Sequence, residues 1–413
     1  MTDAKPYLSV IVTSRNDDHG GNLLKRMQYF VDGWLYQARK FNLPCELIIV
    51  EWNPPAERPP LAQALRWSET GPCTVRILEV PRRVHHRFKS ADQLPLFQFI
   101  AKNAAIRRAR GEYLLCTNID ILFSDEMMAF LAARRLRPDR IYRNDRYDVP
   151  FDIPPGLDIP QILEFCARNV LRVNRRSVTI HLENNSIYPA DLWRLDAYAA
   201  CSAEVIKSTG IILARLPMVA ATAWQVANQP EWRSLGERLR AGGRILGTLW
   251  GKYSMSFKAI RTTLRGATKT RRLMKVLHTN ACGDFTIMAA DKWLKMRGHL
   301  EFEGYSMHLD SLLLMGAVYG GLAEEEVLPS PMRHYHIEHG TGSGFTPENE
   351  DKFYKGLRAR GLSWMDWGEI LRLSRQILER KVAVEFNDEN WGLGTMPLRE
   401  TVIGQVRPTH AAE

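Results

Sequence analysis

Apolar runs of strand length alternate with helical segments over the first 118 residues, and this alternation constrains the fold more than any other feature. The runs are rich in β-branched residues, as expected for strands buried on both faces. Between them, apolar residues recur at helical spacing in 21–41 and 96–109. The runs themselves are 7–13, 46–51, 74–80 and 112–118. Strands that alternate with helices predict an α/β fold with a Rossmann-like, mostly parallel sheet flanked by helices.

Polar residues follow three of these strands at the point where each strand ends. In a parallel sheet, ligands bind in the crevice outside the carboxyl ends of the strands. Asn, Asp and Ser are also common in ordinary strand-terminal turns, so either a binding site or turn chemistry explains them. The residues are Ser14, Arg15, Asn16 and Asp17 after the first strand, Glu51 and Asn53 after the second, and Asn118 and Asp120 after the fourth.

Asp120 lies between the apolar strand 112–118 and the apolar residues 121–123. A carboxylate with such neighbours needs hydrogen-bond partners or a metal ion, because a buried charge without either is costly. A divalent cation such as Mn²⁺ or Mg²⁺ would satisfy it. The alternative is a helix N-cap network around Ser124. Asn118, two residues earlier, offers an amide oxygen but no charge.

Two further motifs suit the same chemistry. His336 and His339 lie in the stretch RHYHIEHGTGSGF at 333–345, which its glycines predict to be a loop. Both are candidate metal ligands, although isolated histidines are often structural. Asp310 lies in the first turn of a helix that Gly320 and Gly321 close. The helix dipole favours its ionised form, which suits either a capping acid or a general base.

The chain carries a net charge of +10, and the segment 231–275 alone holds twelve basic and two acidic residues. Leu, Ile, Trp, Tyr and Phe are interleaved with these bases, which predicts contact with an anionic membrane surface. A helical lid or an oligomer contact with a solvated basic face is the alternative. We expect no nucleic-acid partner, because the charge is confined to one segment and no recognised nucleic-acid motif occurs.

The length of 413 residues exceeds what one hydrophobic core usually needs. We expect two halves of one α/β domain at 1–200 and 278–345, a helical basic insertion at 201–277 and a C-terminal extension at 346–413. No run of about 20 apolar residues predicts a membrane span. The six scattered cysteines and the absence of a signal-like N-terminus predict a cytoplasmic protein, with peripheral contact at the inner face of the membrane.

In order along the chain, these motifs resemble the GT-A glycosyltransferases of the family 2 type. LSVIVTSRNDD resembles the first strand and nucleotide loop of that family. KNAAIRRARGEYLLCTNIDILFS, which contains Asn103, resembles the segment that ends in a metal-binding Asp-x-Asp. ACGDFTIMAADKWLKMRGHLEFEG, with Gly283 and Asp284, resembles the acceptor-side strand. SMHLDSLLLMGAVYGG resembles the helix start that carries the catalytic base, and RHYHIEH falls where a C-terminal His often reaches the metal.

The resemblance implies a divalent-metal-dependent, inverting transfer of a sugar from a nucleotide-diphosphate sugar to the hydroxyl of a sugar or lipid-linked acceptor. Asp310 matches the base, and Asp120 matches the second acid of the metal motif. Asn118 stands in place of the first acid, and His308 in place of the Glu that usually precedes the base. Glu51 and Asn53 replace the usual acidic pair at the nucleotide. The alternative is a GT-A-like protein that binds nucleotide sugars without catalysis.

Overall fold

The computed structural model describes residues 5–189, 277–339, 350–394 and 396–404, together with a few positions between 224 and 243. The expected basic insertion lies almost entirely outside these residues, so its membrane contact stays a prediction. Among the helices that the structure describes, none is long and apolar enough to cross a membrane.

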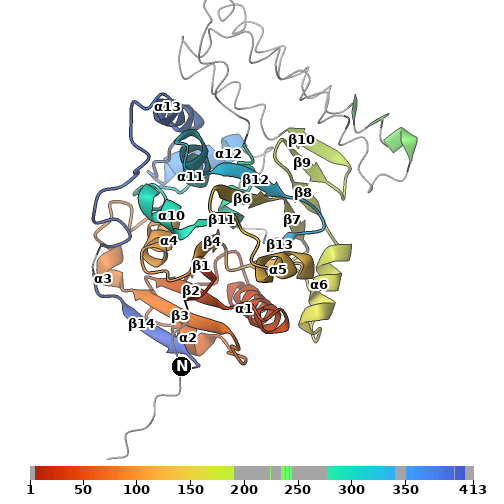
Figure 1. Ribbon diagram of the computed structural model, residues 1–413, viewed down its shortest axis with the longest axis horizontal. Helices are drawn as coiled ribbons and strands as arrows, with labels where there is room; N and C mark the ends of the chain where they lie inside the picture. The colour runs from red at the N-terminus through yellow and green to blue at the C-terminus, as the bar shows by residue number, and fades with distance from the viewer. Residues whose placement is uncertain are drawn as a thin grey trace, which may run out of the picture.

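An eight-stranded sheet forms the centre of the fold, in the order β12-β6-β11-β4-β1-β2-β3-β14 (Figure 1). The four strands expected from the sequence are confirmed as β1 Leu8–Ser14, β2 Cys45–Trp52, β3 Cys73–Val80 and β4 Tyr113–Thr117. The other strands are β6 Arg140–Asn144, β11 Phe285–Ala289, β12 Glu324–Leu328 and β14 Arg399–Ile403.

The sheet is mixed, so the prediction of a mostly parallel sheet is wrong. Strands β3, β2, β1 and β4 are parallel, as are β6 and β12. Strand β11 runs antiparallel to both β4 and β6, and β14 runs antiparallel to β3. The strand–helix alternation covers only the first 118 residues, whereas β11 and β14 come from later in the chain and run against their neighbours.

Helices cover both faces of this sheet (Figure 1). Successive side chains of a strand point to opposite faces, so Ile11 of β1 joins the core under one set of helices and Val10 and Val12 join the other. The first set is α4 Gln98–Ile106, α10 Ala290–Met296 and α11 Leu309–Tyr319, and the second is α1 Leu23–Lys40 and α5 Asp125–Ala132. Short helices α2 Leu61–Ala64 and α3 Arg82–His85 lie in the connections around β3.

A second sheet, in the order β10-β9-β8-β7-β13-β5, lies beside the first, and α6 Ile159–Arg168 packs on it. Its strands are β5 Ile121–Phe123, β7 Arg146–Val149, β8 Arg172–Asn174, β9 Val178–His181, β10 Ser186–Pro189 and β13 His334–Ile337. The chain passes from the first sheet to the second at 118–120, at Asp145 and at 329–333. The residues between β4 and β5 therefore lie where the two sheets meet.

The prediction of a loop at 333–345 is wrong for the first part of this stretch, because His334–Ile337 forms β13 between β5 and β7. Tyr335 and Ile337 are buried in the core of the second sheet, and this alternation fixes the strand. Residues 340–345 lie outside the described part of the chain. Towards the C-terminus, α12 Glu350–Ala359 and α13 Trp367–Leu378 cover α11, and β14 completes the first sheet.

Candidate functional site

A pocket of about 740 Å³ lies at the carboxyl ends of β1 and β4, where the two sheets meet. It brings together eight of the side chains expected from the sequence. They are Ser14, Arg15, Asp17, Asn118, Asp120, Asp284, His336 and His339. The remaining seven, which do not line it, are Asn16, Glu51, Asn53, Asn103, Gly283, His308 and Asp310.

Four of these seven residues form hydrogen bonds to the backbone of neighbouring segments. Asn16 donates to the carbonyl of Pro59 at 2.9 Å, and Asn53 donates to that of Pro95 at 3.4 Å. Asn103 donates to the carbonyl of His299 at 2.7 Å and accepts from its N–H at 2.8 Å. Glu51 accepts from the N–H of Leu61 at 2.8 Å, and burial raises the pKa of its carboxyl to about 7.

The residues around the start of α11 lie at the edge of the pocket, which Leu309 lines. Asp310 accepts from the N–H of Ser311 at 2.8 Å. A Cβ at Gly283 would lie 3.1 Å from Asp310 Oδ2, so the carboxylate packs against the turn before β11. His308 packs against Trp367 with ring centroids 4.4 Å apart and the rings tilted by 41°, which ties α11 to the C-terminal helices.

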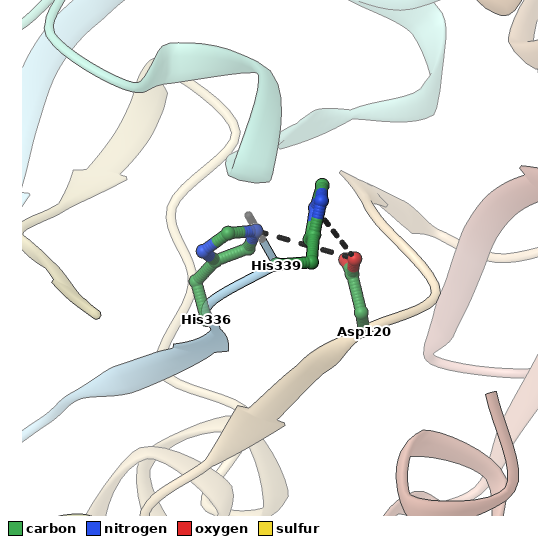
Figure 2. A group of neighbouring side chains, drawn as sticks. All are labelled: Asp120, His336 and His339. Carbon is green, nitrogen blue, oxygen red and sulfur yellow. Dashed lines mark ion pairs between the residues drawn. The ribbon is translucent and has the colours of Figure 1, made fainter. Parts of the chain in front are cut away.

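Asp120, His336 and His339 form a cluster that could hold a metal ion (Figure 2). The Nε2 atoms of His336 and His339 lie 4.0 and 3.4 Å from Asp120 Oδ2. Asp148 bonds Nδ1 of His336 at 2.8 Å, which leaves Nε2 facing Asp120. Such carboxylate–histidine contacts orient imidazoles for metal binding.

The donor set fits a divalent ion of the first transition series better than Mg²⁺, because two of its three ligands are imidazoles. Nδ1 of His339 is buried and has no hydrogen-bond partner among the described residues. Gly20, with φ of +74°, packs against this ring, because a Cβ there would lie 2.8 Å from Nδ1. The loop after β1 therefore closes one side of the cluster.

Arg26, which the sequence did not point to, also binds Asp120. Its Nη1 lies 2.6 Å from Asp120 Oδ2, its Nη2 donates to the carbonyl of His19 at 2.6 Å, and the residue is 2% exposed. Burial alone would raise the pKa of Asp120, but the His339 hydrogen bond and the charges of His336, His339 and Arg26 hold it well below its usual range. The Asp120 carboxylate is therefore ionised. A metal ion bound to it would share this carboxylate with Arg26.

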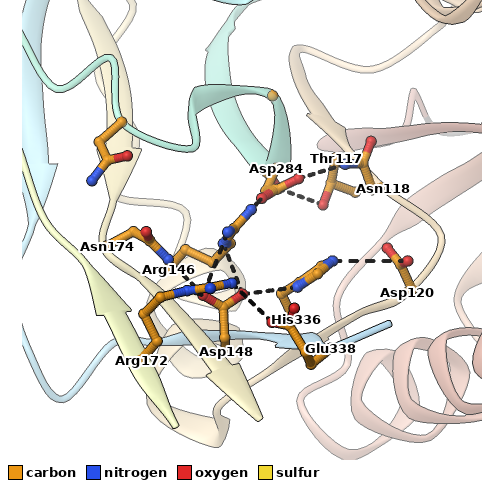
Figure 3. A network of polar contacts seen from close by, with 12 residues as sticks. Thr117, Asn118, Asp120, Arg146, Asp148, Arg172, Asn174, Asp284, His336 and Glu338 are labelled. Atoms are coloured by element: carbon orange, nitrogen blue, oxygen red, sulfur yellow. Dashed lines mark hydrogen bonds and ion pairs between the residues drawn. The ribbon is translucent and has the colours of Figure 1, made fainter. Parts of the chain in front are cut away.

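A chain of alternating charges runs along one wall of the pocket, and we call it the charge ladder (Figure 3). Its five members are Asp284, Arg146, Asp148, Arg172 and Glu338. Successive contacts measure 2.6, 3.0, 2.7 and 2.8 Å. All members except Asp148, which is completely buried, line the pocket. Positive neighbours, chiefly Arg146, outweigh burial and lower the pKa values of Asp148 and Asp284.

Asn118 joins the ladder to the first sheet through its amide. Its Oδ1 accepts from Lys102 Nζ at 2.9 Å and from Gln98 Nε2 at 3.0 Å, and its Nδ2 donates to Asp284. Lys102 is completely buried in α4 and also donates to the carbonyl of Gly283 at 3.1 Å. Burial lowers the pKa of Lys102, and the charges of nearby carboxylates offset this lowering only in part.

Sequence reasoning missed Arg26, Lys102, Arg146, Asp148 and Arg172. Only Lys102 gives a local signal, because it is the one charged residue among the apolar positions of α4. Arg146, Asp148 and Arg172 come from β7 and β8, strands of four and three residues, which are too short for periodicity to detect.

Comparison with known proteins assigns neither a family nor a function to this sequence. The sequence matches no protein-family model, and no curated protein matches it.

Proposed function

We propose that this protein is a glycosyltransferase with a GT-A-like fold, which transfers a sugar from a nucleotide-diphosphate sugar to an acceptor hydroxyl with inversion. The observation that carries the proposal is the Asp120–His336–His339 cluster at the carboxyl edge of parallel strands. It adjoins a pocket of about 740 Å³, which is large enough for a nucleotide sugar.

The loop after β1 would bind the nucleotide. Ser14, Arg15 and Asp17 line the pocket at the end of β1, and the Arg15 Nε lies 3.4 Å from Asp17. The cluster would hold Mn²⁺ or a similar divalent ion, which would neutralise charge on the leaving diphosphate. Asp148 orients His336, and Arg26 holds Asp120 in place.

Asp310 would act as the general base that takes the proton from the acceptor hydroxyl. It lies in the first turn of α11, where the helix dipole stabilises its carboxylate. The Gly283 turn packs against the same carboxylate and limits its position. A sugar or lipid-linked acceptor would approach from this side, and the segment 231–275 would bring a cytoplasmic enzyme to an anionic membrane.

The experiment that tests this proposal is a turnover assay with UDP- and GDP-sugars and Mn²⁺, on wild type and two variants. Asp310→Asn removes the candidate base, and Asp291→Asn removes an acid from the first turn of α10, away from the pocket. We expect Asp310→Asn to lose turnover by roughly 10²-fold or more while it still binds nucleotide, and Asp291→Asn to keep both. Equal turnover in the two variants contradicts the role of Asp310.

Two observations favour a second function, that of a non-catalytic nucleotide-sugar-binding protein. Asn118 gives no charge to the metal cluster, and its amide is already bonded to three side chains. Arg26 already pairs with one carboxylate oxygen of Asp120. Calorimetry with UDP- and GDP-sugars, followed by the turnover assay, separates the two functions. Binding without hydrolysis or transfer supports the second, and turnover excludes it.

A further inference from the structure

We propose that the charge ladder recognises the sugar of the donor and selects a neutral sugar over one that carries a carboxylate. The proposal rests on the proposed function, since it concerns the ligand of the same pocket. It assigns the substrate class from the charges that the pocket presents.

The ladder is built before any ligand binds. Each of its two guanidinium groups is shared between two carboxylates: Arg146 lies between Asp284 and Asp148, and Arg172 lies between Asp148 and Glu338. Asn174 adds a bond to Asp148 at 2.6 Å, so the central acid is held on both oxygens. Three acids against two bases leave the ladder with a net charge of −1.

A sugar hydroxyl suits this surface because it can accept from a guanidinium N–H and donate to a neighbouring carboxylate at the same time. Asp148 is buried behind the wall, so the hydroxyls of a neutral sugar would meet two donors, Arg146 and Arg172, flanked by two acceptors, Asp284 and Glu338. A sugar carboxylate is an acceptor only, so it would face Asp284 or Glu338 or displace one of them from its arginine. Like charges brought together in this way provide selection against the wrong ligand.

The other arginines that line the pocket do not offset this repulsion. Arg26 is bound to Asp120, and Arg15 lies beside Asp17. Arg360 follows α12 and is exposed, so water screens its charge. The ladder also braces the second sheet, and a role limited to bracing predicts no preference between neutral and anionic sugars.

The test compares donors that differ only at C6. Calorimetry in Mn²⁺ measures the binding of UDP-glucose against UDP-glucuronate, and of GDP-mannose against GDP-mannuronate. In whichever pair binds, we expect the neutral donor to bind at least roughly tenfold more tightly than the uronate donor. Glu338→Gln frees Arg172 from one carboxylate and should reduce this ratio severalfold. Glu338 is partly exposed, with 36% of its side chain accessible, so the variant should fold.

Glu324→Gln is the matched control, because it removes an acid of β12 that pairs with Arg140 of β6, outside the pocket. It should keep the wild-type ratio. Equal or tighter binding of the uronate by wild type, or an unchanged ratio in Glu338→Gln, overturns the ladder's role and leaves the proposed function standing. If no UDP or GDP sugar binds at all, the proposed function fails and the inference fails with it.

Discussion

At the scale of single residues, Lys102 is the feature that most departs from ordinary protein interiors. It is completely buried, and in the described part of the chain its Nζ contacts an amide and a carbonyl but no carboxylate within ion-pairing distance. Burying an ammonium without a paired charge is expensive, so the residue is retained at a cost in stability. Its bonds to Asn118 and Gly283 place that charge between the metal cluster and the start of α11.

We predict that Lys102→Met leaves the free energy of unfolding at pH 7 within about 1 kcal/mol of wild type or raises it. The pKa of Lys102 is lower in the folded state than in the unfolded state. The buried ammonium therefore destabilises the fold most at low pH, and this destabilisation fades as pH rises towards the unfolded pKa. The advantage of the variant should therefore shrink between neutral and alkaline pH. Urea denaturation across that range measures it, with exposed Lys25→Met as the control. A loss of several kcal/mol contradicts the prediction.

Individual site residues can be predicted where their type conflicts with their surroundings. Asp120 is such a residue, because an acid between two apolar runs needs a partner, and the structure supplies Arg26, His336 and His339. The partner Arg26 cannot be predicted in the same way, since basic residues are ordinary on an exposed helix. Its burial follows only from the packing of α1 beside β5.

At the scale of elements, the C-terminal strand β14 is held to the sheet by an ion network around the buried Arg76. Arg76 on β3 bonds Glu46 on β2 at 2.8 Å and Glu400 on β14 at 2.7 Å, and its side chain is 3% exposed. The network joins residues that are more than 300 positions apart in the sequence. No sequence pattern predicts this pairing, because β14 is an edge strand whose alternation is weak.

We predict that Glu400→Gln lowers the free energy of unfolding at neutral pH by about 1–2 kcal/mol, because it leaves a buried arginine with one carboxylate instead of two. The Arg76 hydrogen bond lowers the pKa of Glu400, so its contribution is present above the unfolded pKa and is lost as pH falls through the folded one. The difference between the variant and wild type should therefore vanish in acid. Exposed Glu389→Gln serves as the control. A difference that does not change with pH contradicts this account.

At the scale of the whole molecule, the pocket exists because two sheets meet at three crossings of the chain. The sequence predicts the parallel half of the first sheet, since its strands are long and apolar. It does not predict the second sheet, whose strands have three or four residues, or the antiparallel course of β11. Candidate ligands could therefore be chosen by residue type, but the charge ladder beside them could not.

The central claim is that Asp120, His336 and His339 hold a divalent cation that binds the diphosphate of a nucleotide. Calorimetry of UDP and GDP, with Mn²⁺ or with chelator, tests it most directly in wild type, His339→Gln and the exposed control His86→Gln. We predict that Mn²⁺ tightens nucleotide binding at least roughly tenfold in wild type and in the control, and has no effect in His339→Gln. Nucleotide binding that is equally tight in chelator, or a Mn²⁺ effect that survives in His339→Gln, would contradict the account.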